Sequence, residues 1–260
     1  MFYIACVVYN KKISDIRSLD KYEKISYAHN DIKIIIVDNT SNEVIIQENK
    51  SYKKSNTIQY ICNEENLGLS KAYNIVLGNT NSEDWILWTD DDTLFSEEYL
   101  NNVYSATFID NVRVIAGFVR TNKGSLLSPI SCSHDNNTVY HEHTIYNNLY
   151  CINSGLCVKR SIYDSIGYYD ERMFVDMIDY WFFDELRKVD FDNVLIVPGF
   201  ILQNFSGTSR GPILSKIKRF KVYSKDFNIY CSLERRPLAY RISVLVRHLG
   251  KIILGQFLKD

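Results

Sequence analysis

A series of short, nearly uninterrupted apolar runs constrains the fold of this chain more than any other feature. The runs cover Phe2–Tyr9, Lys33–Val37, Ile58–Cys62, Trp85–Thr89 and Arg113–Val119. Apolar runs of this length are typical of strands that are buried on both faces of a parallel sheet. A protein with such strands needs helices on both faces of the sheet to cover them.

Helix-length segments separate these runs. The segment between the first two runs is polar, with apolar residues at Leu19, Ile25 and Tyr27, and the segments Leu67–Leu77 and Glu97–Phe108 also have helical character. Strands that alternate with helices at this spacing predict a doubly wound α/β domain with right-handed crossovers. We therefore expect a mostly parallel central sheet with helices on both faces.

The pattern weakens after residue 120. Lys123–Asn148 is polar and rich in Ser, Asn and His, so we expect an irregular excursion there. Tyr150–Val158 has strand character, Arg160–Ile166 predicts a short helix, and Val194–Val197 predicts a last strand. These elements extend the same domain, which we expect to cover residues 1–209.

Composition excludes several classes of protein. Hydrophobic residues make up 46% of the chain and charged residues 23%, which is typical of a globular protein and not of a disordered or fibrous one. The six cysteines include no Cys-x-x-Cys pair, which favours a reducing compartment. Met1 leads directly into an apolar run without a basic region, and no apolar stretch reaches the ~18 residues of a membrane span. We expect a cytoplasmic protein.

Charge divides the chain near residue 210. Residues 210–260 carry 12 Lys and Arg against 3 Asp and Glu, whereas residues 1–209 carry 18 against 28. We interpret residues 210–260 as a basic, helical C-terminal extension whose partner should be anionic. Within it, Arg241–Leu254 predicts an amphipathic helix with basic residues at 241, 247 and 251. Such a helix could lie on an anionic membrane surface, pack on its own domain, or form a homodimer interface.

Polar clusters follow three of the predicted strands. Tyr9-Asn10 follows the first strand, Asp38-Asn39 the second and Asp90-Asp91-Asp92 the fourth. One acidic turn alone would be explained equally well as a helix cap or a solvated loop. Three clusters at the carboxyl edge of one sheet predict a binding site, because ligands of parallel α/β sheets bind there.

The aspartate triplet is the most informative of the three clusters. Carboxylates that follow a buried strand repel one another unless a cation lies among them. Oxygen ligands presented in a loop suit Mg²⁺ or Mn²⁺, which bind through one or two carboxylates together with substrate phosphates. The alternative is that the triplet caps the helix that follows, although Ser96 is the better cap.

The ordered set of motifs resembles the family 2 glycosyltransferases, which have the GT-A nucleotide-diphosphosugar transferase fold. The resemblance covers roughly residues 2–207, and its later part is similar to bacterial rhamnosyltransferases and galactofuranosyltransferases. The motifs are Val7-Val8-Tyr9-Asn10, Val37-Asp38-Asn39, the loop Asn66–Asn74, Asp90-Asp91-Asp92, Asn153-Ser154-Gly155 and the stretch Gly167–Asp179.

The resemblance implies an inverting, metal-dependent glycosyltransferase. Its donor would be a UDP or dTDP sugar, with rhamnose, galactofuranose or galactose as the sugar, and its acceptor a growing bacterial surface glycan such as a capsule or O-antigen. Residues 1–120 would form the nucleotide-binding half and residues 121–209 the acceptor half. Because such acceptors are lipid-linked, the enzyme would work at the inner face of the plasma membrane.

The resemblance also implies roles for individual residues. Asp38 would accept hydrogen bonds from the base or ribose, and Asn66 and Gly68 would let the chain pass close to the nucleotide. The implied donor-binding residues are Val8, Tyr9, Asn10, Asp38, Asn66, Gly68, Lys71, Asp90, Asp91, Ser154 and Gly155. The metal, Mn²⁺ or Mg²⁺, would be held by Asp92, Asp90 and Asn204.

Two aspartates are candidates for the general base that inversion requires. The later one of the family stretch matches Asp179, and Asp176 is the second candidate. The alternative is that both belong to a helix that Asp176 caps.

Two departures from the family pattern leave a second function open. Tyr180-Trp181-Phe182 stands where many relatives have Glu-Trp or Asp-Trp, and Asn204 stands where many have a metal-binding His. A catalytically weak or inactive carbohydrate-binding or scaffolding relative is therefore the alternative. We interpret His134, His141 and His143 as surface residues, and the acidic domain disfavours a nucleic-acid partner.

Overall fold

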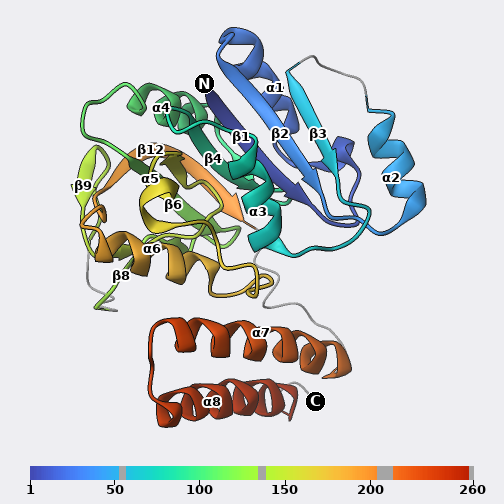
Figure 1. Ribbon diagram of the computed structural model, residues 1–260, viewed down its shortest axis with the longest axis vertical. Helices are drawn as coiled ribbons and strands as arrows, with labels where there is room; N and C mark the ends of the chain where they lie inside the picture. The colour runs from blue at the N-terminus through green and yellow to red at the C-terminus, as the bar shows by residue number, and fades with distance from the viewer. Residues whose placement is uncertain (53–56, 134–138, 204–212, 258–260) are drawn as a thin grey trace.

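A computed structural model describes residues 1–52, 57–133, 139–203 and 213–257. The described residues form a curled central sheet with helices on both faces and a helical pair at one end (Figure 1). The mixed α/β fold predicted from the alternation of apolar runs and helical segments is confirmed.

The N-terminal half of the sheet is entirely parallel. Its strands are β1 (Phe2–Val8), β2 (Ile32–Asp38), β3 (Ile58–Cys62) and β4 (Trp85–Asp90), and they lie in the order β3-β2-β1-β4. The register pairs Val8 with Asp38 on β2, so the carboxyl ends of β1 and β2 lie at the same edge. This is the arrangement that the apolar runs predict.

The C-terminal half of the sheet is mixed. Here β11 (Cys157–Lys159) lies antiparallel between β4 and β6 (Val114–Thr121), and β12 (Val194–Gln203) runs parallel to β6. Three shorter strands complete this half of the sheet: β5 (Leu94–Phe95), β7 (Leu126–Ser128) and β9 (Thr144–Tyr146). A separate two-stranded sheet consists of β8 (Ile130–Ser131) and β10 (Leu149–Tyr150).

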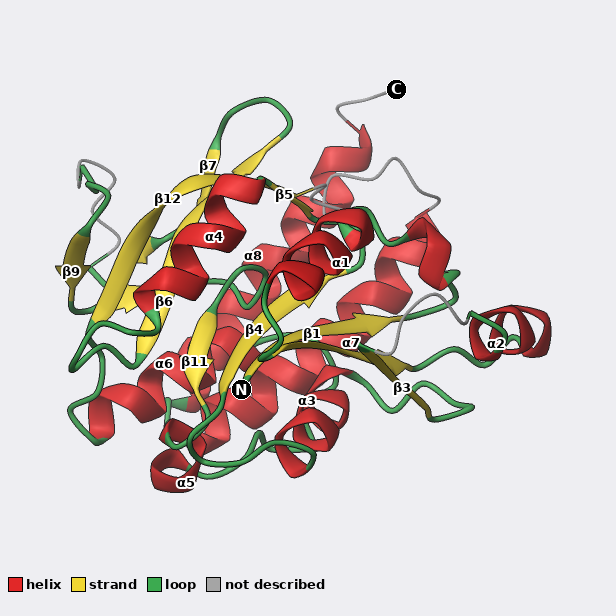
Figure 2. Cartoon of the chain, turned by 90° about the horizontal axis from the view of Figure 1, so that it is seen from above, coloured by secondary structure: helices red, strands yellow, loops and turns green. Residues whose placement is uncertain are grey.

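Alternate residues of each parallel strand enter two different cores. On β1, Ile4 and Cys6 pack with α1 (Leu19–Ala28) and α4 (Glu97–Ala106), whereas Ala5 packs on the other face. That other core contains side chains of α3 (Leu69–Gly78), α5 (Ile162–Ile166) and α6 (Ile178–Lys188). Seen from above, the helices lie on both sides of the sheet (Figure 2). Burial of both faces explains why the strand sequences are apolar throughout.

Local capping fixes where α4 begins. The hydroxyl of Ser96 accepts a hydrogen bond from the backbone N–H of Tyr99 at 3.0 Å, and Glu97 and Glu98 occupy the first turn. Both features stabilise a helix N-terminus. Because Ser96 caps α4, the aspartate triplet does not, and the capping alternative for it is wrong.

The structure differs from the predicted elements in three places. The predicted strand Tyr150–Val158 is divided between β10 and β11, with Gly155 at φ +91 between them. The predicted irregular excursion contains the short strands β7, β8 and β9. The 3₁₀ turn η1 (Ile13–Asp15) and the helix α2 (Glu43–Lys50) were not predicted, and α2 begins at Asn42, whose side chain accepts from the N–H groups of Val44 and Ile45.

The C-terminal region forms two antiparallel helices, α7 (Ile213–Leu233) and α8 (Leu238–Phe257). Figure 1 shows α7 nearer to α6 and α8 outermost. The side chains of Phe227, Tyr230 and Cys231 on α7 are buried in the same core as α6. The predicted boundary near residue 210 lies outside the described residues, but α7 shares the core of the preceding domain.

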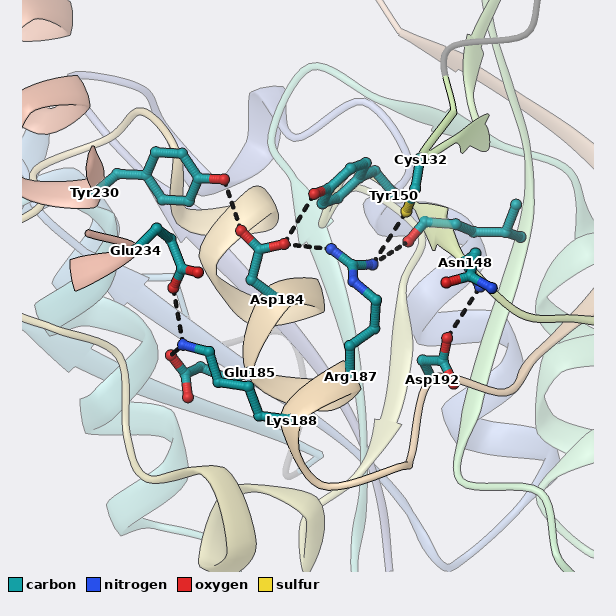
Figure 3. Close-up of polar contacts among 11 residues, drawn as sticks. Cys132, Asn148, Tyr150, Asp184, Glu185, Arg187, Lys188, Asp192, Tyr230 and Glu234 are labelled. Atoms are coloured by element: carbon teal, nitrogen blue, oxygen red, sulfur yellow. Dashed lines mark hydrogen bonds and ion pairs between the residues drawn. The ribbon is translucent and has the colours of Figure 1, made fainter. Parts of the chain in front are cut away.

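A buried carboxylate strengthens the contact between α6 and α7 (Figure 3). Asp184 on α6 accepts hydrogen bonds from the hydroxyls of Tyr150 at 2.8 Å and Tyr230 at 2.6 Å, and it also forms an ion pair with Arg187. A charged group is stable at a buried position only with such partners. Nearby, Lys188 pairs at 2.9 Å with Glu234, the residue that follows α7. These contacts make α7 part of the folded domain.

Among the helices in the described part of the chain, none is both long enough and apolar enough to cross a membrane.

Candidate functional site

A cleft of about 960 Å³ opens near the carboxyl ends of β1 and β4. Its lining comes from four parts of the chain: the strand ends, the loop before α3, the segment around β10 and the segment that leads into α6. Arg219 of α7 also lines it. The parallel sheet therefore places the cleft where the polar strand ends predict a binding site.

The three aspartates after β4 have different surroundings. Asp91 pairs with Lys11, with 3.0 Å between Oδ1 and Nζ, and Asp90 accepts a hydrogen bond from the side-chain amide of Gln203 at 2.8 Å. Within the part of the chain that the structure describes, no hydrogen bond or ion pair reaches the carboxylate of Asp92. Asp90 and Asp92 both line the cleft.

Negative charge accumulates at this end of the cleft. Burial, followed by the charges of Asp92 and Asp91, raises the pKa of Asp90 to about 7. Burial and the charge of Asp91 also raise the pKa of Asp92. The charges of Lys11 and Arg17 lower the pKa of Asp92 but do not cancel this effect. A divalent cation would supply further positive charge.

The donor atoms present here fit a cation that is shared with a substrate. In the described residues there is no group of three or more His, Cys, Asp or Glu side chains arranged to hold a metal. Asp90 and Asp92 together offer carboxylate oxygens to the cleft, and Mg²⁺ and Mn²⁺ commonly bind one or two carboxylates with phosphate oxygens completing the shell. Asn204, the third predicted ligand, lies outside the described residues.

Asp179 lies in the first turn of α6 and lines the same cleft. Burial raises its pKa to about 7, and the charge of Asp90 adds to the effect. No protein side chain among the described residues forms an ion pair with it. A carboxylate in this position can accept a proton from a bound hydroxyl.

Asp176 has a different environment. Both of its carboxylate oxygens are bonded to the guanidinium of Arg219 on α7, with 2.6 Å between Nη2 and Oδ1. The N-cap of α6 is Met177, which has a left-handed backbone and no capping side chain. The proposed cap by Asp176 is therefore wrong.

The opposite wall of the cleft is mostly apolar and aromatic. Tyr150 and Tyr180 lie with their rings 4.7 Å apart, and Leu127, Ile130 and Ile152 lie beside them. Asp184 accepts a hydrogen bond from the hydroxyl of Tyr150 (Figure 3). The Arg187 guanidinium lies 4.5 Å from the centre of the Tyr150 ring. The sequence motifs did not include Tyr150, whereas Tyr180 belongs to the stretch Tyr180-Trp181-Phe182 that departs from the family pattern.

Comparison with protein-family models decides the class of protein. The model for glycosyl transferase family 2 matches residues 8–167, which begin at the last residue of β1 and contain the cleft loop before α3 and the aspartate triplet. The chain belongs to this family. It is therefore a glycosyltransferase, as the ordered motifs predicted.

Solved structures of glycosyltransferases have the same fold. The chain aligns with residues 1–349 of TarS from S. aureus at a TM-score of 0.57 and 14% identity, over 97% of this chain and 80% of that one. It aligns with the mannosyltransferase PcManGT from Pyrobaculum calidifontis, solved with GDP-Man and Mn²⁺, at a TM-score of 0.56 and 12% identity, over 96% of this chain and 69% of that one. For GalNAc-T7, solved with UDP, GalNAc and Mn²⁺, the TM-score is 0.55 and the identity 12%, over 78% of this chain and 43% of that one.

These structural alignments extend the family assignment to the GT-A fold of the neighbours, and at such identities they establish the fold alone. The chain spans less than half of GalNAc-T7. A comparison with curated protein sequences finds no match.

Most of the predicted site residues of this glycosyltransferase line one cleft. They are Tyr9, Asn66, Gly68, Asp90, Asp91, Asp92, Ser154, Asp176 and Asp179. The cleft brings together residues that are more than 160 positions apart in the sequence, between Tyr9 and Asp179. His141 and His143 are exposed and line no part of the cleft, and His134 lies outside the described residues.

Five predicted donor-binding residues do not line the cleft: Val8, Asn10, Asp38, Lys71 and Gly155. Val8 is buried in the core, and a Cβ on Gly155 would lie 2.6 Å from the side chain of Ile201, so the structure gives both a packing role. Asn10 is exposed and its backbone N–H donates to Thr40. No contact that the structure describes connects Lys71 to the cleft.

Asp38 is completely buried and has three protein donors. Its carboxylate accepts hydrogen bonds from the backbone of Thr40, the side chain of Asn49 and the hydroxyl of Tyr60, at distances of 2.7–2.9 Å. These bonds tie β2 to α2 and β3. Its contact with the donor remains a prediction, whereas the neighbouring Asn39, which was not among the predicted site residues, does line the cleft.

Gly68 brings the loop before α3 against the segment before α6. Its φ is +81, and a Cβ there would lie 2.6 Å from the carbonyl oxygen and from the ring of Phe174. The next residue, Leu69, donates its backbone N–H to that same carbonyl at 2.6 Å. Asn39 also donates to the Gly68 carbonyl at 3.1 Å. The two cleft loops therefore touch through a residue that has no side chain.

We expect Gly68→Ala to lower both stability and ligand binding. The added methyl group must displace Phe174 and adopt a strained φ, which together should cost about 2–4 kcal/mol of unfolding free energy. Gly124→Ala is the matched control, because Gly124 has φ +83 but no atom near the added methyl. Urea unfolding of both variants measures the difference, and equal losses would show that contact with Phe174 contributes nothing.

Proposed function

We propose that this glycosyltransferase transfers a sugar from a nucleotide-diphosphate donor to a glycan acceptor with inversion, using a divalent metal and Asp179 as the general base. One observation carries the proposal. Asp90 and Asp92 line the cleft without an ion pair among the described residues, and Asp179 lines the same cleft, where the charge of Asp90 helps to raise its pKa. The arrangement offers one group of carboxylates for a metal and a separate one for a proton.

The donor would bind between the loop before α3 and the aspartates. Asn39, Asn66 and Gly68 line the nucleotide side, and Asp90 and Asp92 would hold Mn²⁺ or Mg²⁺ together with the diphosphate oxygens. When bound, the metal would neutralise the charge of the departing diphosphate. The Mn²⁺ in the structures of PcManGT and GalNAc-T7, with GDP-Man and UDP respectively, supports this choice.

Asp179 would accept the proton of the acceptor hydroxyl as that oxygen attacks the anomeric carbon opposite the leaving diphosphate. Of the two candidate bases it is favoured, because Asp176 is already occupied by a two-point ion pair with Arg219. Both oxygens of Asp176 are taken up by the guanidinium, which leaves them less available to an acceptor hydroxyl. The intact set of Asp90, Asp92 and Asp179 also favours an active enzyme over a binding or scaffolding relative.

The acceptor would lie against the aromatic wall. Tyr150 and Tyr180 offer ring faces of the kind on which the apolar face of a sugar packs. A growing bacterial surface glycan, capsule or O-antigen and lipid-linked, is the acceptor that we propose from the resemblance to rhamnosyltransferases and galactofuranosyltransferases. Rhamnose, galactofuranose or galactose would be the transferred sugar, carried by UDP or dTDP.

We expect Asp92→Asn to weaken nucleotide-diphosphate binding by roughly tenfold or more in the presence of Mn²⁺, because one carboxylate ligand is lost. Calorimetry of UDP and dTDP binding measures the effect, and Asp20→Asn on the exposed surface of α1 is the control. EDTA should weaken binding to the wild type and have little further effect on the variant. Identical affinities of the wild type with Mn²⁺ and with EDTA would contradict the metal site.

We expect Asp179→Asn to lower the rate of transfer by roughly 10²–10⁴-fold while donor affinity changes by less than about twofold, because the base acts on the acceptor. Asp176→Asn is the matched variant and should retain far more activity. Transfer to a soluble glycan acceptor and donor binding are measured for both. An active Asp179→Asn together with an inactive Asp176→Asn would reverse the two roles.

The exposed surface of α8 supports the proposed contact with an anionic membrane. Leu238, Ile242 and Val246 recur every four residues and are 69%, 54% and 63% exposed. They form one apolar stripe on the helix, and the exposed Arg247 and Lys251 lie on the same helix. Arg241 is not a free cation, because its guanidinium binds the carbonyl oxygens of Arg236 and Cys231 at the end of α7.

We expect the full chain to bind phosphatidylglycerol vesicles at low salt and to release them at high salt, since charge attraction is screened over about 10 Å at 0.1 M ionic strength. The double variant Ile242→Asn, Val246→Asn should bind at least about tenfold more weakly, because each buried apolar side chain contributes about 1.5–3 kcal/mol.

Val44→Asn on α2 is the matched control, since Val44 is equally exposed at 69%. Vesicle sedimentation measures binding and light scattering measures the oligomeric state. If the wild type ignores the vesicles at low salt and the double variant turns a dimer into a monomer, the stripe is a homodimer interface instead.

A further inference from the structure

One carboxylate that does not line the cleft accepts hydrogen bonds from the backbone of three consecutive residues that do. Asp226 on α7 is completely buried and accepts hydrogen bonds from the N–H groups of Phe174, Val175 and Asp176 at 2.9, 2.8 and 2.9 Å. A buried carboxylate is stable when several N–H donors surround it, because bonds to a charged acceptor are stronger than neutral ones. Asp226 therefore fixes the path of this short segment.

The segment leads directly into the first turn of α6. It ends at Met177, which has φ +64, an unfavourable backbone conformation for a residue with a side chain. A backbone of this kind persists only when its surroundings hold it in place. Asp179 follows two residues later, so any shift of the segment moves Asp179 as well.

The same segment is held from two sides. On one side the carbonyl of Phe174 accepts the N–H of Leu69, next to the glycine of the cleft loop before α3. On the other side α7 contributes both Asp226 and Arg219, which are seven residues apart and so lie on one face of the helix. Arg219 binds the side chain of Asp176 while Asp226 binds its backbone N–H.

We propose that Asp226 is a positioning residue for sugar transfer, which fixes the position of Asp179 in the cleft by holding the segment 174–177. Arg219 is the second residue of α7 that holds this segment. The inference rests on the proposed role of Asp179 as the general base. It makes α7 a working part of the acceptor site, separate from the membrane contact proposed for α8.

The test uses the full-length protein and the variants Asp226→Asn, Asp179→Asn and the double variant. Asp226→Asn removes one acceptor and places an NH₂ group against N–H donors. We expect it to lower the kcat of transfer by roughly 10–100-fold and to change the affinity for UDP or dTDP with Mn²⁺ by less than about twofold. Hydrogen exchange of the amides 174–176 should become at least about tenfold faster.

The double variant separates positioning from a general structural effect. If Asp226 acts through Asp179, the double variant is no slower than Asp179→Asn alone, because the effects of residues that act as a unit do not multiply. The proposal would be overturned if the losses of kcat from the two single variants multiply in the double variant, or if Asp226→Asn has full activity. Failure of the proposed base would appear separately, as transfer by Asp179→Asn with Asp226 intact.

Two further variants guard against simple misfolding. Glu234→Gln, one residue past the end of α7, removes an ion pair with Lys188 and no contact to the segment, and it should leave the kcat unchanged. Arg219→Gln changes an exposed side chain, so it should fold, and we expect a loss of kcat of roughly threefold to tenfold without a change in donor affinity. Normal transfer by Arg219→Gln, together with an unfolded Asp226→Asn, would assign Asp226 to stability alone and overturn the proposal.

Discussion

Repulsion between like charges is the constraint on which the site depends. Asp90, Asp92 and Asp179 share one cleft, and burial together with their mutual repulsion raises the pKa of Asp90 and of Asp179 to about 7. Three other carboxylates near the cleft have partners of their own. Asp91 pairs with Lys11 and Asp176 with Arg219, while Asp226 is surrounded by N–H groups. Asp91 and Asp176 also line the cleft, so Asp90, Asp92 and Asp179 are its aspartates without an ion pair among the described residues.

Much of the sheet could be predicted from the sequence because parallel strands buried on both faces consist of apolar residues throughout. The predicted run Ile58–Cys62 coincides with β3, and Trp85–Thr89 differs from β4 by one residue. The cleft was also predictable in outline, since parallel strands bring their carboxyl ends together. The mixed half was harder, because β11 is three residues long and is defined by its two neighbours and not by a pattern of its own.

Contacts between distant parts of the chain could not be predicted. Nothing in the local sequence of Asp226 distinguishes it from a solvated aspartate on a basic helix, and its three donors lie about 50 residues earlier in the chain. The same limit applies to Asp38, whose position after an apolar strand indicates a ligand contact, whereas its donors are Asn49 and Tyr60. A motif gives the place of a carboxylate in the chain, and its partners depend on tertiary packing.

The close contact between the loop before α3 and the segment before α6 has a kinetic consequence. The N–H of Leu69 and the carbonyl of Phe174 join the loop proposed for the donor to the segment that precedes Asp179. A donor that orders the first loop would thereby order the second, and the acceptor pocket would be complete only in the donor-bound enzyme. With the proposed roles, such an enzyme would follow an ordered sequential scheme with the donor as leading substrate, and water would rarely replace the acceptor before the nucleotide is seated.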